Sequence, residues 1–262
     1  LLAFGGSRRE WVNLSYAKSK YGAVWESKDG GETWAHKSTV GSGADIRSAA
    51  FAGGNPRVLL VSTRDQGIFR SDDGGSTWTS KNEGLPDRRI DVIAAHPRDP
   101  RILWCSLTAG HRSVYQSMDG GETWRWSGEG LPDDEKHPHF HSKISVAPSN
   151  PAVLYVANSN WQQLFRSDDG GAHWRNISEN RMPSTPTALG FQGNWIEVDP
   201  HDENTVYTCN SVHIFKTTDG GKSWAETTSR AGAISGTWQG RGYSGYVPTQ
   251  VKWNPYQPKQ LV

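Results

Sequence analysis

The sequence predicts an all-β fold, a β-propeller of four-stranded blades, and three observations support this prediction. An eight-residue motif, Ser/Thr-x-Asp-Gly-Gly-x-x-Trp, occurs five times in 262 residues. Its copies start 44 to 50 residues apart, which is the period of propeller blades. The composition, with 29 Gly and 13 Trp, favours tight turns and aromatic packing over aliphatic helices. Repetition over the whole length therefore indicates one domain, residues 1–262.

The motif itself is expected to form a hairpin turn. Its copies are SKDGGETW, SDDGGSTW, SMDGGETW, SDDGGAHW and TTDGGKSW, which begin at Ser27, Ser71, Ser117, Ser167 and Thr217. The paired glycines supply the positive φ angles of a tight turn. The Asp and Ser/Thr side chains can accept hydrogen bonds from backbone N–H groups across that turn. The Trp is expected to pack back over its own hairpin.

The rest of each period predicts three strands before the motif and one after it. First strands end before a proline at residues 90–96, 144–147, 195–199 and 250–254. Second strands follow at residues 58–62, 102–106, 153–157 and 206–209. A third strand, such as residues 67–70, leads into the motif, and a fourth begins at the motif Trp. Four strands per period make one blade.

The repeat register leaves two arrangements open. Residues 1–4 match a second strand and residues 258–262 match the turn into one, so both ends fall at the same point of the period. The chain is then either a five-bladed ring whose first blade takes its inner strand from the C-terminal segment, or a fragment of a larger propeller. Propellers contain about 4–8 blades, and we favour the fragment.

Charge and motif content narrow the function classes. The net charge of +1 gives no global field toward nucleic acid or an anionic membrane, and neither is expected as a partner. No apolar run has the length of a membrane span. Cys105 and Cys209 fall in predicted strands and are expected to be separate buried thiols. No phosphate loop, dinucleotide motif or nucleophile elbow occurs, so no cofactor is expected.

The five motifs resemble the Asp-box, or bacterial neuraminidase repeat, superfamily along the whole chain. That superfamily includes sialidases, xyloglucan-directed glycoside hydrolases, sortilin-type receptors and a photosystem assembly factor. The resemblance implies a secreted or periplasmic protein whose motifs lie on the face opposite the active site. It therefore implies that the motif aspartates are structural, neither catalytic nor calcium-binding. Sialidases also carry an Arg-Ile-Pro motif, which this chain lacks. The sequence is closest to the glycoside hydrolase-like members, and fold alone does not assign an activity.

Two aspartates are the candidate catalytic residues. Residues 59–71, LLVSTRDQGIFRS, resemble a stretch in which xyloglucan hydrolases place a catalytic Asp, which by resemblance is Asp65, although this segment is one residue shorter. Asp91 is expected on the same face of the adjacent blade. Glycoside hydrolysis needs two carboxyl groups about 5–5.5 Å apart for retention or about 6.5–9.5 Å apart for inversion. In those enzymes the second carboxylate comes from a second propeller, which this chain does not show.

Substrate contacts are expected from loops on the face opposite the motifs. The aligned first strands place Arg47, Asp91, Ser142, Asn194 and Thr249 at one position that is always polar and never repeated, which indicates either a ligand-facing ring or ordinary solvent-facing strand ends. Aromatic rings stack on sugars, and Arg or Asn side chains bond their hydroxyls. The candidate substrate-binding residues are Arg47, Arg64, Arg112, His141, Trp161, Asn194, Trp195, Trp238, Arg241 and Tyr243.

A histidine run needs separate treatment. His137, His139 and His141 would share one side of an extended segment and could bind a metal, but Pro138 interrupts strand geometry and no metal is assigned. The sequence therefore predicts a carbohydrate-active propeller, leaning toward a glycoside hydrolase that acts on or binds a polysaccharide. The alternative is a non-catalytic propeller that binds a protein or peptide on the same face.

Overall fold

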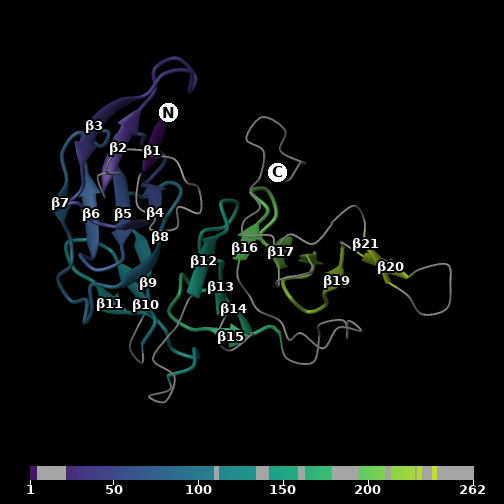
Figure 1. Cartoon of the computed structure of the whole chain (residues 1–262). Coiled ribbons are helices and arrows are strands. Elements are labelled where there is room, and N and C mark those ends of the chain that lie inside the picture. The colour runs from purple at the N-terminus through teal and green to yellow at the C-terminus, as the bar shows by residue number, and fades with distance from the viewer. Residues whose placement is uncertain are drawn as a thin grey trace. The chain divides into compact units, whose positions relative to one another are not determined.

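The computed structural model describes residues 1–4, 22–108, 112–133, 142–158, 163–178, 195–209, 214–227, 229–231 and 238–240. Among these residues every regular element is a β-strand, as predicted. No helix with the length and hydropathy needed to cross a membrane is found in them. The chain divides into two compact units, Leu1–Trp126 and Ser127–Val262. Each unit is built from antiparallel blades (Figure 1).

Unit 1 contains three blades whose strands follow each other in sequence order. Blade 1 has three strands, β1 (Leu2–Phe4), β2 (Ala23–Glu26) and β3 (Ala35–Thr39). Blade 2 has four, β4 (Ile46–Phe51), β5 (Leu59–Thr63), β6 (Ile68–Ser71) and β7 (Thr79–Ser80). Blade 3 also has four, β8 (Ile90–Ala95), β9 (Leu103–Leu107), β10 (Val114–Ser117) and β11 (Arg125–Trp126).

Unit 2 contains two four-stranded blades and a hairpin. Blade 4 consists of β12 (Ser142–Val146), β13 (Leu154–Asn158), β14 (Gln163–Ser167) and β15 (Arg175–Asn176). Blade 5 consists of β16 (Trp195–Val198), β17 (Val206–Cys209), β18 (Ile214–Thr217) and β19 (Ala225–Glu226). The pair β20 (Ser229–Ala231) and β21 (Trp238–Gly240) follows.

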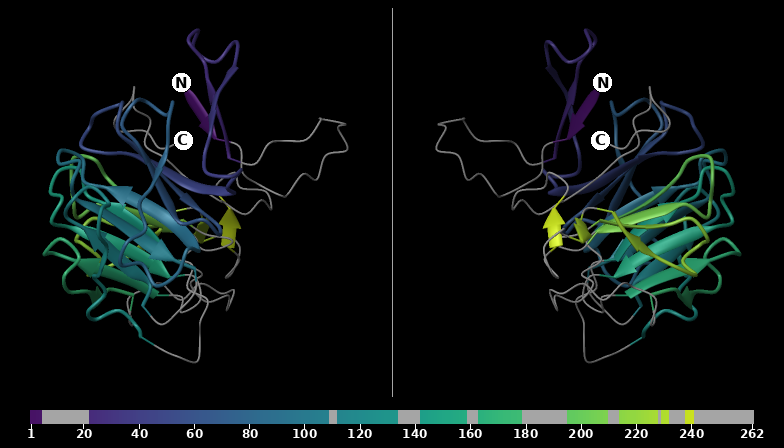
Figure 2. Two further views of the ribbon diagram at one scale, coloured as in Figure 1. Left: turned by 90° about the vertical axis from the view of Figure 1, so that its left-hand side faces the viewer. Right: turned by 90° about the vertical axis from the view of Figure 1, so that its right-hand side faces the viewer.

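The predicted blade plan is confirmed with small shifts at the strand ends. The fourth strand begins one residue after the motif Trp, as β7 does after Trp78, because that indole turns out of the ladder. The predicted strand at residues 250–254 lies outside the described residues. Antiparallel order puts the motif turn and the β5–β6 turn at opposite ends of blade 2. The views of Figure 2 show the strands side by side with the turns at their ends.

The motif turns are held by the side chains that the sequence assigns to them. In blade 2 the Asp73 carboxylate accepts the backbone N–H groups of Ser76 and Thr77, each at 2.9 Å. Its Oδ2 accepts the Thr77 hydroxyl at 2.7 Å. These hydrogen bonds, with Thr77 N–H first, hold the pKa of Asp73 well below its usual range. Gly74 and Gly75 have φ angles of 73° and 87°, so the turn requires glycine.

The motif tryptophans contact their own turns, as predicted and as Trp174 does through a 3.0 Å hydrogen bond to the Gly171 carbonyl, and they also reach residues of the preceding repeat. Trp124 Nε1 donates to the carbonyl of Lys81 at 3.0 Å, and Trp174 Nε1 donates to that of Ser127 at 2.8 Å. Both rings are buried, with 2% and 5% of their surface exposed. Trp34, by contrast, bonds its own Gly31 carbonyl and is 41% exposed. The motif Trp therefore joins neighbouring blades as well as closing its own turn.

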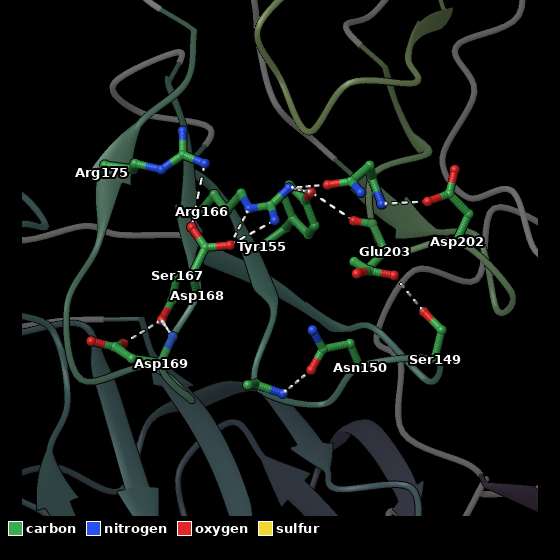
Figure 3. A network of polar contacts seen from close by, with 12 residues as sticks. Ser149, Asn150, Tyr155, Arg166, Ser167, Asp168, Asp169, Arg175, Asp202 and Glu203 are labelled. Carbon is green, nitrogen blue, oxygen red and sulfur yellow. Dashed lines mark hydrogen bonds and ion pairs between the residues drawn. The ribbon is translucent and has the colours of Figure 1, made fainter.

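An arginine makes a second connection between blades 4 and 5 in unit 2 (Figure 3). Arg166 Nη1 donates to the Tyr155 hydroxyl at 2.7 Å and to Asn204 Oδ1 at 2.8 Å. Its Nε donates to Asp168 at 2.7 Å. Burial raises the pKa of Tyr155 to about 12, although the Arg166 charge opposes the shift. This network is structural, since it satisfies a guanidinium that is only 8% exposed.

Candidate functional site

The ends of the unit 1 blades opposite the motif turns form the candidate site. We call this the distal edge: residues 41–47 and 84–91, which lead into β4 and β8, with the β5–β6 turn and residues 108 and 112–113 beside the ends of β9 and β10. The edge is held by backbone bonds that recur between blades. Arg64 N–H donates to the Asp45 carbonyl and Thr108 N–H to the Arg89 carbonyl, each at 2.9 Å. Equivalent positions of blades 2 and 3 therefore share one backbone frame.

Asp65 lies at the tip of the turn between β5 and β6. The turn is fixed by Thr63, whose hydroxyl donates to the Gly67 carbonyl at 2.7 Å and accepts the Gln66 N–H at 3.0 Å. Gly67 has a φ angle of 84°, and a side chain there would meet Asn82. The Asp65 side chain is exposed, and no ion pair joins it to another residue in the described part of the chain. A rigid turn thus presents an accessible carboxylate at the distal edge.

Arg64, next to Asp65, is also exposed, and its position is fixed by an aspartate. Its Nε donates to Asp45 Oδ2 at 2.8 Å, and 60% of its side-chain surface remains exposed. The Nη groups have no hydrogen bond to a described residue and face solvent. Arg64 therefore offers oriented donors beside the Asp65 carboxylate, as a substrate-contacting residue would.

Arg47 and Asp91 occupy matching irregularities in the two inner strands. Ile46 pairs with Thr63 and Ser48 with Ser62, so Arg47 is an extra residue in β4, and Asp91 is the extra residue between the paired Ile90 and Val92 of β8. Such β-bulges redirect a side chain and occur next to functional sites. Here they turn the two side chains toward each other, with Arg47 Nη2 at 3.4 Å from Asp91 Oδ1. The predicted equivalence of the two positions is confirmed.

Burial separates the two candidate catalytic aspartates. Asp91 is 3% exposed and lies against Arg47, while the Ser62 hydroxyl donates to its backbone carbonyl at 3.3 Å. Asp65 is exposed on the same edge. A ligand can therefore reach the Asp65 side chain from solvent, whereas the Asp91 side chain is buried beside the Arg47 guanidinium. This placement favours Asp65 as the group that touches a ligand and Asp91 as the group that orients Arg47.

Arg112 lies over an aromatic ring that sequence reasoning missed. Its guanidinium carbon is 4.4 Å from the ring centre of Trp126 in β11. Trp126 is 37% exposed, and Arg112 is exposed as well. A cation–π contact of this kind orders both side chains. The available signal was a second Trp two residues after the motif Trp124, at the end of a strand that turns toward the distal edge.

The unit 2 candidates are mostly outside the described residues. His141, Trp161, Asn194, Arg241 and Tyr243 lie there, and so does the run from His137 to His141. The backbone of Trp238 lies in β21.

Trp195 is placed in β16 and is only 5% exposed, so its ring packs inside rather than offering a surface for stacking. Its Nε1 is buried without a hydrogen-bond partner among the residues described.

The described residues contain neither a metal-binding cluster nor a reactive thiol. Within the described ranges no group of three or more His, Cys, Asp or Glu side chains could hold a metal ion. Cys105 and Cys209 are free and buried. Burial raises the pKa of Cys209 to about 11 and that of Cys105 well above its usual value, which leaves both thiols protonated and unreactive.

Comparisons with known proteins agree with this architecture. A family model described as Sortilin, neurotensin receptor 3 matches residues 22–133, which is less than half of the chain. None of the curated proteins compared matches the chain. Among solved structures it is similar to the GH74 enzyme of Niastella koreensis, with 20% identity and a TM-score of 0.60 over 80% of this chain and 35% of that one.

Two further solved structures show the same fold. The GH74 xyloglucanase of Xanthomonas campestris is 19% identical with a TM-score of 0.57, over 78% of this chain and 34% of the enzyme. A chain of the nidogen/laminin complex is 14% identical with a TM-score of 0.54, over 76% of this chain and 72% of that one. The chain spans about a third of the length of the two GH74 enzymes. The repeats, the blades and these likenesses together show that this chain has a β-propeller fold built from Asp-box repeats.

Proposed function

We propose that this chain is a carbohydrate-active β-propeller that binds a polysaccharide at the distal edge of unit 1. One observation carries the proposal: the rigid β5–β6 turn presents the exposed Asp65 carboxylate beside the exposed Arg64 donors, at the end of the blade away from the motif turns. Sugar hydroxyls both donate and accept hydrogen bonds, so they match paired carboxylate and guanidinium groups. Secretion is part of the same proposal and rests on the superfamily resemblance.

Aromatic contact supports the carbohydrate assignment. Trp126 is exposed near the distal end of blade 3, and Arg112 holds its ring in place at 4.4 Å. An indole that keeps exposed surface offers an apolar ring to the C–H face of a sugar, while the guanidinium donates to hydroxyls. Two GH74 enzymes have the same fold, which is consistent with carbohydrate binding by this propeller.

Hydrolysis by Asp65 and Asp91 has weaker support than binding. A glycosidase needs both carboxyl groups to flank the scissile bond. Asp65 is accessible, but Asp91 is buried behind Arg47. We therefore propose Asp65 as the residue that contacts the sugar in any hydrolytic step. The burial of Asp91 is also the observation that favours the alternative, a non-catalytic propeller that binds a protein or peptide.

The test is a polysaccharide panel with three variants of the full chain. Wild type, Asp65→Asn and Asp91→Asn would be compared for binding by affinity electrophoresis and for release of reducing ends. Asp99→Asn is the matched control, since Asp99 pairs with Arg101 in the β8–β9 turn, at the opposite end of the blade. We expect polymer binding in which Asp65→Asn lowers affinity or turnover and Asp99→Asn changes neither. Wild-type protein that binds and cleaves no polymer would overturn the proposal.

A further inference from the structure

Three arginines of the distal edge are paired with aspartates. The closest nitrogen–oxygen distances are 3.4, 2.8 and 2.6 Å, in the pairs Arg47–Asp91, Arg64–Asp45 and Arg89–Asp87. The positive charge of these three guanidinium groups is therefore largely offset. Opposite charges at these distances reduce the field felt by an approaching ligand.

The Arg47–Asp91 pair differs from the other two in burial. Asp91 is 3% exposed, whereas the Arg47 side chain is 29% exposed. Arg47 uses only one Nη2 contact to Asp91, and its Nε and Nη1 form no hydrogen bond to a described residue. The carboxylate is thus buried and the guanidinium partly exposed, with donors that are not used by a described residue. A buried charge is screened less by solvent than an exposed one, so Asp91 acts strongly on whatever binds Arg47.

This arrangement discriminates between ligand charges. An acidic sugar at Arg47 would place a second carboxylate close to Asp91, and like charges disfavour each other in a partly buried place. An uncharged sugar hydroxyl takes the same guanidinium donors without that repulsion.

We propose that Asp91 is a specificity-determining residue of the distal edge, which cancels the charge of Arg47 so that this arginine selects uncharged glycan groups over acidic ones. The inference rests on the proposed function and adds the chemical class that the edge accepts.

Asp45 offsets the charge of Arg64 as Asp91 offsets that of Arg47, but this pair lies nearer the surface. The side chain of Asp45 is 15% exposed, and that of Arg64 is 60% exposed. Removal of the Asp45 charge would leave Arg64 as an uncompensated cation, with a smaller effect because solvent screens it. Asp45→Asn therefore provides a second variant that does not disturb a buried group.

The experiment compares two named polymers, uncharged galactan and acidic polygalacturonate, by affinity electrophoresis at low and high salt. Wild type should bind galactan in preference to polygalacturonate. Asp91→Asn should tighten polygalacturonate binding about three- to tenfold at low salt, a gain that high salt should reduce. Asp45→Asn should also tighten polygalacturonate binding, by about twofold. Asp99→Asn, which frees Arg101 at the opposite end, should leave both affinities unchanged.

The possible outcomes separate this inference from the proposed function. If wild type binds galactan but neither Asp91→Asn nor Asp45→Asn gains affinity for polygalacturonate, the inference is wrong and the proposed function stands. A wild type that prefers polygalacturonate, or an equal gain in Asp99→Asn, also overturns the inference. If no variant binds either polymer, the inference is overturned, and the proposed function is overturned as well only if wild type also binds and cleaves no polymer of the full panel.

Discussion

Replacing one motif tryptophan tests whether this residue joins blades or only closes its own turn. Trp124→Phe removes the 3.0 Å hydrogen bond to Lys81 and shrinks a ring that is 2% exposed. The lost hydrogen bond costs about 1 kcal/mol, with the Lys81 carbonyl left unpaired. The smaller ring adds roughly 1 to 2 kcal/mol through lost burial and residual cavity. The expected fall in the free energy of unfolding is therefore about 2 to 3 kcal/mol.

The matched control is Trp34→Phe, the same change at the same motif position in blade 1. Trp34 is 41% exposed and bonds the carbonyl of Gly31 in its own turn, so water can replace what is lost. We expect a cost of about 0.5 kcal/mol or less. Urea denaturation followed by circular dichroism would measure both variants. Equal costs would refute the reasoning, because they would place the stabilisation within the hairpin rather than between blades.

Two further predictions concern unit 2. Arg166→Met should lower the free energy of unfolding, measured by urea titration, by about 2 kcal/mol, because it removes the donor to Tyr155 from a buried network. The control is Arg175→Met, which breaks an exposed ion pair and should change the free energy of unfolding by about 0.5 kcal/mol or less. The pKa of His173 is raised by its hydrogen bond to Asp169 at 2.7 Å. The stability that protonated His173 adds to the folded state is therefore complete below about pH 6.5 and declines as pH rises through the raised pKa. The stability difference between wild type and His173→Thr, measured by thermal denaturation from pH 5 to pH 9, should shift in favour of the variant as pH rises; a constant difference would contradict this assignment.

Much of the fold follows from residues whose geometry leaves few alternatives. The double glycine after each motif Asp admits a tight turn and little else, as Gly74 and Gly75 show with their positive φ angles. The strands on either side then follow from spacing, since a hairpin fixes antiparallel neighbours. The exception is the motif Trp, whose direction depends on the neighbouring blade. Trp124 finds its acceptor in Lys81, 43 residues away, and no local pattern contains that information.

The candidate site was less predictable for a physical reason. Sequence alignment finds Arg47 and Asp91 at one position, but the distance between them depends on two β-bulges, each of which adds a residue to one strand. A one-residue change in register moves a side chain to the other face of a sheet. Burial of Asp91 and exposure of Asp65 therefore could not be read from strand alternation.

The aspartates of the motif turns and those of the distal edge bind different groups, although arginine–aspartate pairs such as Arg101–Asp99 also occur at the end opposite the distal edge. At the motif end the aspartates accept several backbone N–H groups, which keeps a carboxylate such as Asp73 ionised and the turn rigid. At the distal edge the aspartates pair with arginine side chains, and these keep free donors. A backbone-bound aspartate has its accepting capacity taken up by the turn. An arginine-bound aspartate leaves part of the guanidinium available, and the recognition that we propose at the distal edge would use the Arg47–Asp91 and Arg64–Asp45 pairs in this way.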